Sequence, residues 1–318
     1  MTFLLRRTQF TIIIIAVFFI FLTGLAFSSI EDTITKSFSV EPGGTLTLES
    51  DIGSIEVQAV EGNTLEVEVI RKVKATNEKK AKKILEDFEI EFSQSGKDVY
   101  IKAEYERDGW QKFWDNVSKR LRVKYIVSVP RIYNLDLKTK GGSISVEDVE
   151  GKVSSRTSGG SLYFDHILGD VNGRTSGGSI KIGEVDGNIV VHTSGGSIRI
   201  NLVKGDVDAH TSGGSITVEE VAGTIRARTS GGSVKAYISH QPESNCRLTT
   251  SGGSITVYME EGIGVNVNAR TSGGRVQTEF PVTLQGTINK RSLKAKINGG
   301  GPELYLRTSG GSIYLRKK

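Results

Sequence analysis

The sequence predicts an all-β fold: a single-chain β-solenoid with coils of about 18 residues, preceded by an α+β cap that contains one helix. Three observations support this fold class. A motif of the form TSGGSI recurs, most of its copies follow one another at the same short interval, and the apolar residues between copies alternate with polar ones. Repetition at a short fixed period is typical of solenoids, in which each coil buries its apolar side against its neighbours. Alternation with a period of two indicates short strands with one buried face.

The motif begins at eight threonines, and a degenerate copy, TKGGSI, begins at Thr139. The eight are Thr157, Thr175, Thr193, Thr211, Thr229, Thr250, Thr271 and Thr308. The first five are evenly spaced, and the slightly longer intervals that end at Thr250 and Thr271 accommodate larger loops. The interval before Thr308 is about twice the regular one and has room for two coils, and residues 292–295 are the candidate for a degenerate repeat between them.

The paired glycines of the motif predict a tight corner in each coil. Glycine adopts left-handed backbone conformations without a Cβ penalty, which is the role we expect for these residues. The alternation places the motif threonines inward. We therefore expect their hydroxyls to form hydrogen bonds with the backbone of the corner.

Residues 1–30 are interpreted as a signal peptide or a signal anchor. Arg6 and Arg7 precede an uncharged run over residues 10–27, and acidic residues follow it, which predicts export of the rest of the chain. The run is close to the shortest stretch that can span a membrane, so cleavage and retention both stay open. If the segment is retained, residues 10–27 contact the membrane. The single cysteine, Cys246, cannot form an intramolecular disulfide.

Residues 31–130 are expected to form a capping region, and residues 131–318 the solenoid repeats. Open ends of a solenoid present unpaired strand edges that favour aggregation, so natural repeat proteins cover them. At the C-terminal end, the basic residues 316–318 are expected to discourage pairing at such an edge.

One helix is predicted in the cap, over residues 77–88. Thr76 or Asn77 provides the N-cap, and Ala81 and Ile84 begin an apolar face that extends to Phe88. We expect this helix to lie over the first coils.

A basic residue stands immediately before the motif threonine, at an outward position, in every coil but one. These residues are Arg156, Arg174, His192, His210, Arg228, Arg270 and Arg307, and Thr249 interrupts the series. Neighbouring strands are about 4.8 Å apart, so the side chains should form a stripe. Lys181, Arg199 and Lys235 are expected to add to the stripe from across the corner.

This stripe is the candidate ligand-binding surface of the chain. Arginine suits bidentate contacts with phosphate or carboxylate groups, so the expected partner is an anionic polysaccharide or another envelope polymer. The alternative interpretation is a solvated face whose charge is balanced by acids on the opposite turn. The net charge of +5 is small for 318 residues, and together with export it argues against nucleic acid as a partner.

We expect no catalytic site, no metal site and no cofactor. The four histidines lack metal-ligand spacing, and the motif serines are repeated turn residues rather than nucleophiles with a neighbouring base. Long β-helices include polysaccharide-acting enzymes, and an acid pair such as Asp165 and Asp170 is conceivable here, but no acid cluster stands out from the solvated turns.

The chain resembles the "putative adhesin" family of bacterial β-strand repeat proteins. The resemblance rests on residues 38–44 (FSVEPGG), residues 125–130 (YIVSVP) and the serial TSGGSI coils, and it covers residues 33–318. It implies a β-solenoid fold and a location in the cell envelope, and it implies no catalytic residues.

The leading hypothesis is an exported, non-enzymatic β-solenoid that acts as an adhesin or scaffold at the bacterial envelope, in the periplasm or at the cell surface. The first alternative is a membrane-anchored accessory protein that takes part in envelope-stress sensing or regulation through a membrane partner protein. The second alternative is a polysaccharide-acting enzyme.

Overall fold

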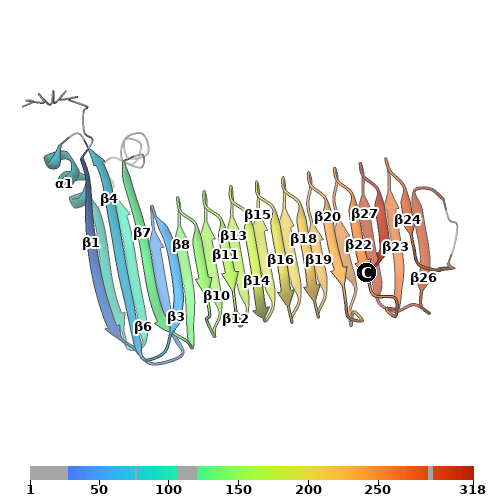
Figure 1. Cartoon of the computed structure of the whole chain (residues 1–318), viewed down its shortest axis with the longest axis horizontal. Coiled ribbons are helices and arrows are strands. Elements are labelled where there is room, and N and C mark those ends of the chain that lie inside the picture. The colour runs from blue at the N-terminus through green and yellow to red at the C-terminus, as the bar shows by residue number, and fades with distance from the viewer. Residues whose placement is uncertain (1–27, 76, 106–119, 286–288) are drawn as a thin grey trace, which may run out of the picture.

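The computed structural model describes residues 28–75, 77–105, 120–285 and 289–318. Two β-sheets, each of 14 strands, lie face to face and run along the whole length of an elongated molecule (Figure 1). The only helix among the described residues, α1 (Glu78–Glu86), lies at the N-terminal end. The predicted β-solenoid is confirmed. The run over residues 10–27 lies outside the described ranges. Within the described ranges, no helix has the length and apolar character required to cross a membrane.

Sheet A contains the strands that follow the motif. In spatial order they are β1 (Ser28–Ser39), β4 (Thr64–Ala75), β7 (Leu121–Pro130), β3 (Ser54–Val60), β9 (Ile144–Glu147), β11 (Leu162–Asp165), β14 (Ile180–Asp186), β16 (Ile198–Val203), β18 (Ile216–Val221), β20 (Val234–Ile238), β22 (Ile255–Met259), β28 (Ile313–Lys317) and β24 (Val276–Thr278), with β12 (Ile167–Leu168) pairing beside β14.

Sheet B contains the strands that lead into the motif. From the C-terminal cap inward they are β25 (Thr283–Leu284), β26 (Ser292–Ile297), β23 (Val265–Thr271), β27 (Glu303–Thr308), β21 (Cys246–Thr249), β19 (Ile225–Arg228), β17 (Val207–Thr211), β15 (Ile189–Thr193), β13 (Val171–Thr175), β10 (Val153–Thr157), β8 (Tyr133–Thr139), β2 (Gly44–Ser50), β6 (Asp98–Tyr105) and β5 (Phe88–Ser95).

Each regular coil contributes one strand to each sheet, and neighbouring coils pair in parallel and in register. Ile180 lies beside Ile198 in sheet A, and Ile189 lies beside Val207 in sheet B. Inward residues alternate with outward ones along these strands, so the core between the sheets consists of rows of stacked aliphatic side chains. A slip of one residue would turn a whole row toward solvent, and this penalty maintains the regular period of the coils.

The TSGG motif forms the corner at which the chain passes from sheet B to sheet A. The Thr193 hydroxyl is buried, donates to the Gly178 carbonyl of the preceding coil at 2.7 Å and accepts the Gly196 N–H at 3.4 Å. The same two bonds recur at all eight motif threonines. The predicted inward threonine and its hydrogen bonds to the corner backbone are confirmed.

The second glycine of each motif is required by close packing of the coils. A Cβ atom on Gly178 would lie 2.0 Å from the Gly160 carbonyl oxygen, and the same position in the other coils is similarly tight. The sequence-based reason, a left-handed backbone, was wrong, because none of the motif glycines has a positive φ. The left-handed glycines lie elsewhere, for example Gly53 and Gly151.

Both ends of the solenoid are assembled out of sequence order. The C-terminal coil, β27 and β28, lies between the coil of β21 and β22 and the coil of β23 and β24. Figure 1 shows the C-terminus inside the stack, short of the far end of the molecule. At the other end, β2 and β3 lie between the pair β6 and β7 and the pair β8 and β9.

This topology corrects two predictions about the C-terminal region. Residues 292–295 belong to β26, which pairs antiparallel with β23 and covers it, so they are not a degenerate coil. Residues 316–318 do not protect a terminal edge, because β28 has a partner strand on each side. An antiparallel hairpin, β25 and β26, terminates sheet B instead.

The inserted coil also explains why one motif reads TSGGRV. In the other coils the motif serine accepts a hydrogen bond from the next coil, as Ser179 does from the Ser197 N–H at 3.2 Å. Ser312 accepts the Arg275 N–H in the same way, at 3.2 Å. Because β24 is the edge strand of sheet A, no coil stacks beyond Arg275 and no acceptor is needed at that position.

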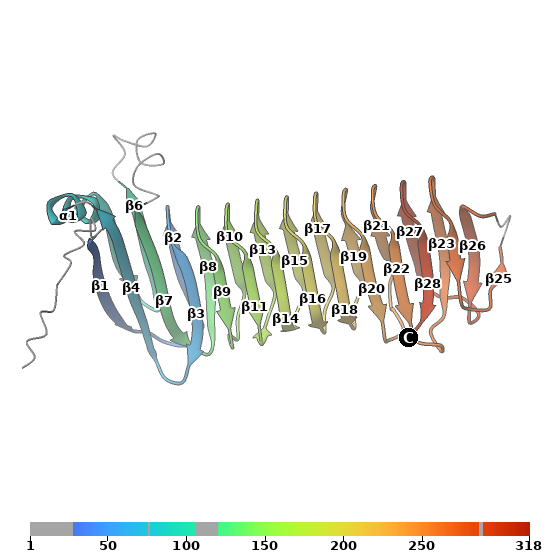
Figure 2. The ribbon, with the colours of Figure 1, turned by 45° about the horizontal axis from the view of Figure 1, so that its top comes forward.

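Antiparallel strands and α1 cover the N-terminal end (Figure 2). Strand β4 pairs antiparallel with β7, β1 with β4, and β5 with β6. Asn77 is the N-cap, since its side chain accepts the Lys80 N–H at 2.9 Å. The helix ends at Glu86, before the predicted end at residue 88, because Phe88 already begins β5. The helix packs on β1, β4 and β5 rather than on the first coils.

Arg71 connects α1 to the strands of the cap. Its guanidinium forms an ion pair with Asp32 of β1, in which Nε lies 2.9 Å from the carboxylate, and it donates to the Leu85 carbonyl at 3.1 Å. The Arg71 side chain is 12% exposed and that of Asp32 is 38% exposed, so the guanidinium is largely shielded from solvent while its partner is not. The bond to the Leu85 carbonyl holds the end of the helix.

The close approach at the corner predicts the effect of Gly178→Ala. The new Cβ would overlap the Gly160 carbonyl, so we expect the free energy of unfolding to fall by about 3 kcal/mol in urea titrations followed by circular dichroism. Gly177→Ala is the matched control, because its Cβ would lie 3.6 Å from the nearest atom, the Gly159 carbonyl oxygen, an ordinary contact distance. Equal destabilisation by the two substitutions would contradict the packing explanation.

Candidate functional site

The seven basic residues predicted before the motif threonines form one column on the outer face of sheet B. The register places Arg156 beside Arg174, and His192 beside His210. Insertion of the C-terminal coil changes the order at the far end. The basic column therefore comprises, in spatial order, Arg156, Arg174, His192, His210, Arg228, Thr249, Arg307 and Arg270, with Thr249 as its uncharged member.

The arginines of the basic column lack counter-charges. None of the five forms an ion pair with a described residue, and all five are exposed. Toward the cap the pattern changes, because Lys138 lies beside Arg156 and its ammonium is 2.7 Å from the Glu49 carboxylate. The basic column is thus a row of positive charges without acidic partners among the described residues. The next basic residue toward the cap, Lys138, is paired with an acid.

Two stacked imidazoles lie in the middle of the basic column. The ring centroids of His192 and His210 are 4.8 Å apart, and the ring planes differ by 4°. Partial burial lowers the pKa of His210, and the neighbouring His192 and Arg228 lower it further, while Asp208 acts in the opposite direction. The neutral form of the His210 imidazole is therefore favoured at this point of the column.

Lys181, Arg199 and Lys235 do not join the basic column. Their strands belong to sheet A, and the side chains lie on its outer face, so the core and both sheets separate them from the column. Each also has a local partner. Arg199 pairs with Glu219 at 3.5 Å, the Lys235 ammonium lies 4.9 Å from the centroid of the Tyr237 ring, and that of Lys181 lies 5.3 Å from the Tyr163 ring.

Asp165 and Asp170 each bind the backbone of the next coil. Asp165 accepts the Glu184 N–H at 2.9 Å and the Tyr163 hydroxyl at 2.9 Å. Partial burial acts to raise the pKa of Asp165, but these hydrogen bonds outweigh it and the pKa lies below its usual value. Asp170 accepts the Asn188 N–H at 2.9 Å. Both carboxylates therefore have a structural role in stacking the coils.

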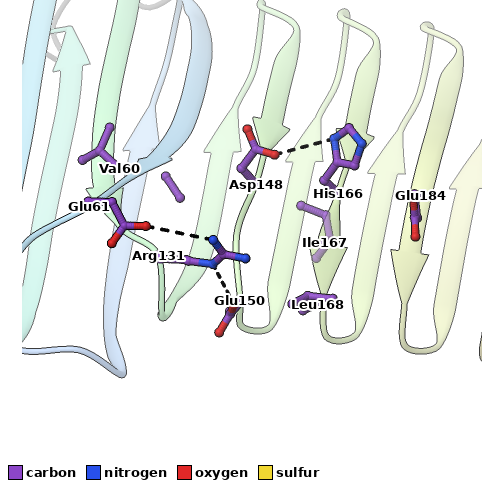
Figure 3. A pocket seen from close by; sticks show the side chains of 10 residues that line it. Val60, Glu61, Arg131, Asp148, Glu150, His166, Ile167, Leu168 and Glu184 are labelled. Atoms are coloured by element: carbon purple, nitrogen blue, oxygen red, sulfur yellow. Dashed lines mark hydrogen bonds and ion pairs between the residues drawn. The ribbon is translucent and has the colours of Figure 1, made fainter.

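A hollow of about 440 Å³ lies near the cap, at the ends of β3, β9 and β11 in sheet A (Figure 3). Arg131 lies between two acids, with Nε 2.7 Å from Glu150 and Nη1 4.0 Å from Glu61. His166 Nδ1 is 3.6 Å from the Asp148 carboxylate. Arg131 is thus paired with acids of this hollow, whereas Glu184, which also lines it, forms no ion pair with a described residue. Nowhere in the described ranges do three His, Cys, Asp or Glu side chains come together to hold a metal ion.

A second hollow, of about 420 Å³, lies on the outer face of sheet B where Thr249 interrupts the basic column. Arg226, Arg228, Arg247 and Arg307 contribute four guanidinium groups to its lining. Arg226 and Arg247 were not among the residues predicted from the sequence. Both occupy the outward position two residues before the column residue of their coil. That position is basic only in these two neighbouring coils, which is the signal that could have identified them.

The lowered pKa of His210 predicts how stability depends on pH. The folded state favours the neutral imidazole, so this contribution is present above the ordinary pKa of about 6.5 and is lost as the pH falls through it toward the lower folded value. Between about pH 7.5 and pH 5, we expect the wild type to lose more stability in urea titrations than His210→Asn. An equal loss in both proteins would show that the charge state of His210 does not affect folding.

The sequence matches the family described as Toastrack DUF4097 over residues 44–316. No curated protein matches the chain. Among solved structures, a putative cell adhesion protein from Clostridium sporogenes is 15% identical, with 90% of this chain and 100% of that chain covered and a TM-score of 0.26.

Two further solved structures are similar over most of their length. A putative lipid binding protein from Parabacteroides distasonis is 11% identical, with 90% of this chain and 97% of that chain covered and a TM-score of 0.42. A putative adhesin from Bacteroides fragilis is 11% identical, with the same coverage and a TM-score of 0.28. The family match covers residues 44–316, which is most of the chain. By this match the chain belongs to the Toastrack DUF4097 family.

Proposed function

We propose that this chain is an exported, non-enzymatic β-solenoid that acts as a rigid binding surface at the bacterial envelope, and that its basic column binds an anionic polymer. The observation that carries the proposal is the uncompensated charge of the column on the outer face of sheet B. Export is inferred from Arg6, Arg7 and the apolar run that follows them.

Stacked arginines have an energetic cost that an external anion would remove. Like charges opposite each other on neighbouring strands are destabilising, and the register brings Arg156 beside Arg174 and Arg270 beside Arg307. Surface lysines and arginines elsewhere on the molecule, such as Lys138, Lys204 and Arg199, lie against acids. The column arginines form no such pair with a described acid, so a bound polyanion is the natural source of compensation.

The shape of the column favours an extended ligand over a compact one. Eight parallel strands at about 4.8 Å spacing give a straight row roughly 34 Å long. A solenoid of stacked coils keeps this spacing fixed, so the ligand meets a pre-organised row of charges. Guanidinium groups bind phosphate or carboxylate oxygens in pairs, which suits a polysaccharide with an acidic group on its repeating unit.

The inventory of reactive groups supports a binding role rather than catalysis. Asp165 and Asp170 accept backbone N–H groups from neighbouring coils, and the motif threonine hydroxyls are engaged at the corners. His166 faces Asp148, and His210 stacks on His192. In the described residues these contacts leave none of the acid, base or hydroxyl candidates assembled as a nucleophile with its base.

The proposal predicts weaker polymer binding when the charge of the column is reduced. Arg156→Gln, Arg174→Gln and Arg270→Gln together should weaken binding of phosphomannan or polygalacturonate by about tenfold or more, because three charge-assisted contacts are lost. The measurement is biolayer interferometry with the full chain in a non-ionic detergent. Neutral dextran is the uncharged reference polymer.

The control removes the same charge from the opposite face. Lys181→Gln, Arg199→Gln and Lys235→Gln alter the outer face of sheet A, so polymer binding should stay within about twofold of the wild type. Equal weakening by both triple variants would mean that binding depends only on net charge. Unchanged binding by the column variant would exclude the column as the binding surface.

A further inference from the structure

A hollow lies within the basic column, around Thr249. Thr249 lies between Arg228 on β19 and Arg307 on β27. Because threonine is much shorter than arginine, its position is a gap between two guanidinium-bearing side chains. Insertion of the C-terminal coil next to β21 makes Arg307, rather than Arg270, the neighbour of Thr249 on this side.

A second row of residues completes the hollow on the side away from the corner. The register there places Arg226 beside Arg247, and Arg247 beside Tyr305. The Arg247 guanidinium lies over the Tyr305 ring, 4.2 Å from its centroid. This stacking fixes the orientation of the guanidinium while its N–H groups stay available.

The charge of the hollow is strongly unbalanced. Of its four arginines, none forms an ion pair with a described residue. Asp208 is the only acid among the described lining residues, and partial burial lowers the pKa of His210 and favours its neutral form. Hydroxyl groups of Thr249, Ser251 and Ser309 lie in the lining as well. A compact anion therefore meets two guanidinium-bearing residues in each row, Arg228 and Arg307 in the column and Arg226 and Arg247 beside it, together with neutral hydroxyls.

We propose that this hollow binds the phosphate group of a phosphorylated sugar. A phosphate monoester carries a charge of about −1.5 to −2 at pH 7 and three acceptor oxygens, which matches several guanidinium groups better than a single carboxylate does. The volume of about 420 Å³ exceeds that of a phosphate ion and is typical of small-molecule sites. The hydroxyls and Asp208 then supply partners for sugar hydroxyl groups.

This inference rests on the proposed function and deepens it by assigning one unit of the envelope polymer to one place on the column. It makes a prediction opposite to that of simple charge attraction. Thr249→Arg adds a positive charge to the column but fills the gap between Arg228 and Arg307. The fold accommodates neighbouring arginines at this position, since Arg156 and Arg174 already lie side by side.

The test is isothermal titration calorimetry of the full chain in a non-ionic detergent, with glucose 1-phosphate as the probe and glucose as the uncharged reference. We expect one site for glucose 1-phosphate and no binding of glucose. Thr249→Arg and Arg247→Gln should each weaken glucose 1-phosphate binding by about tenfold or more. Arg199→Gln is the matched control, because it removes one positive charge from the outer face of sheet A and should leave this affinity within about twofold.

The two proposals fail in different ways. If Thr249→Arg binds glucose 1-phosphate as tightly as the wild type, if Arg247→Gln has no effect, or if the wild type does not prefer the phosphorylated sugar, the site in the hollow is excluded. Those results leave polymer binding by Arg156, Arg174 and Arg270 untouched. Circular dichroism and urea titration of each variant verify that the coils remain folded.

Discussion

The pair of hydrogen bonds made by each buried motif threonine is the interaction on which the rest of the structure depends. One hydroxyl binds the glycine carbonyl of the preceding coil and the glycine N–H of its own coil, so each corner is fixed both internally and to its neighbour. The second glycine allows the two backbones to approach until no Cβ would fit between them. Because every corner is stacked in the same way, the strands on both sides stay in register, and the aliphatic core follows from that register.

The same register turns single residue choices into surface rows. A residue immediately before the threonine lies on the outer face of sheet B, so arginine at that position in several coils produces a row of positive charges along this face. A change in one coil produces a local feature at a known place, as Thr249 does by opening a hollow between two arginines. The basic column and the hollow around Thr249 therefore both arise from changes at one outward position of the repeat, and these changes leave the TSGG corner intact.

Much of this organisation could be predicted from the sequence, because the fixed period of the motif and the alternation determine which side chains point inward. Thr193 in the core, a helix start at residue 76 or 77 and the outward column all follow from local pattern. The order of the terminal coils was not predicted, because the corners are nearly identical in sequence, and the missing motif serine at Arg275 is the one local signal that its coil comes last. Arg307 therefore appears two coils from Arg228 only in the structure. The assignment of Lys181 to the opposite face likewise needed the sheet pairing.

The central claim is that the outer face of sheet B, and not that of sheet A, meets the polymer. Arginine footprinting with phenylglyoxal and mass spectrometry, on the full chain with and without phosphomannan, tests it residue by residue. We predict protection of Arg156, Arg174 and Arg270 on sheet B. Arg199 and Arg316, on the outer face of sheet A, should be modified equally in both conditions. Protection of Arg199 and Arg316 with unchanged labelling of the column would contradict this claim.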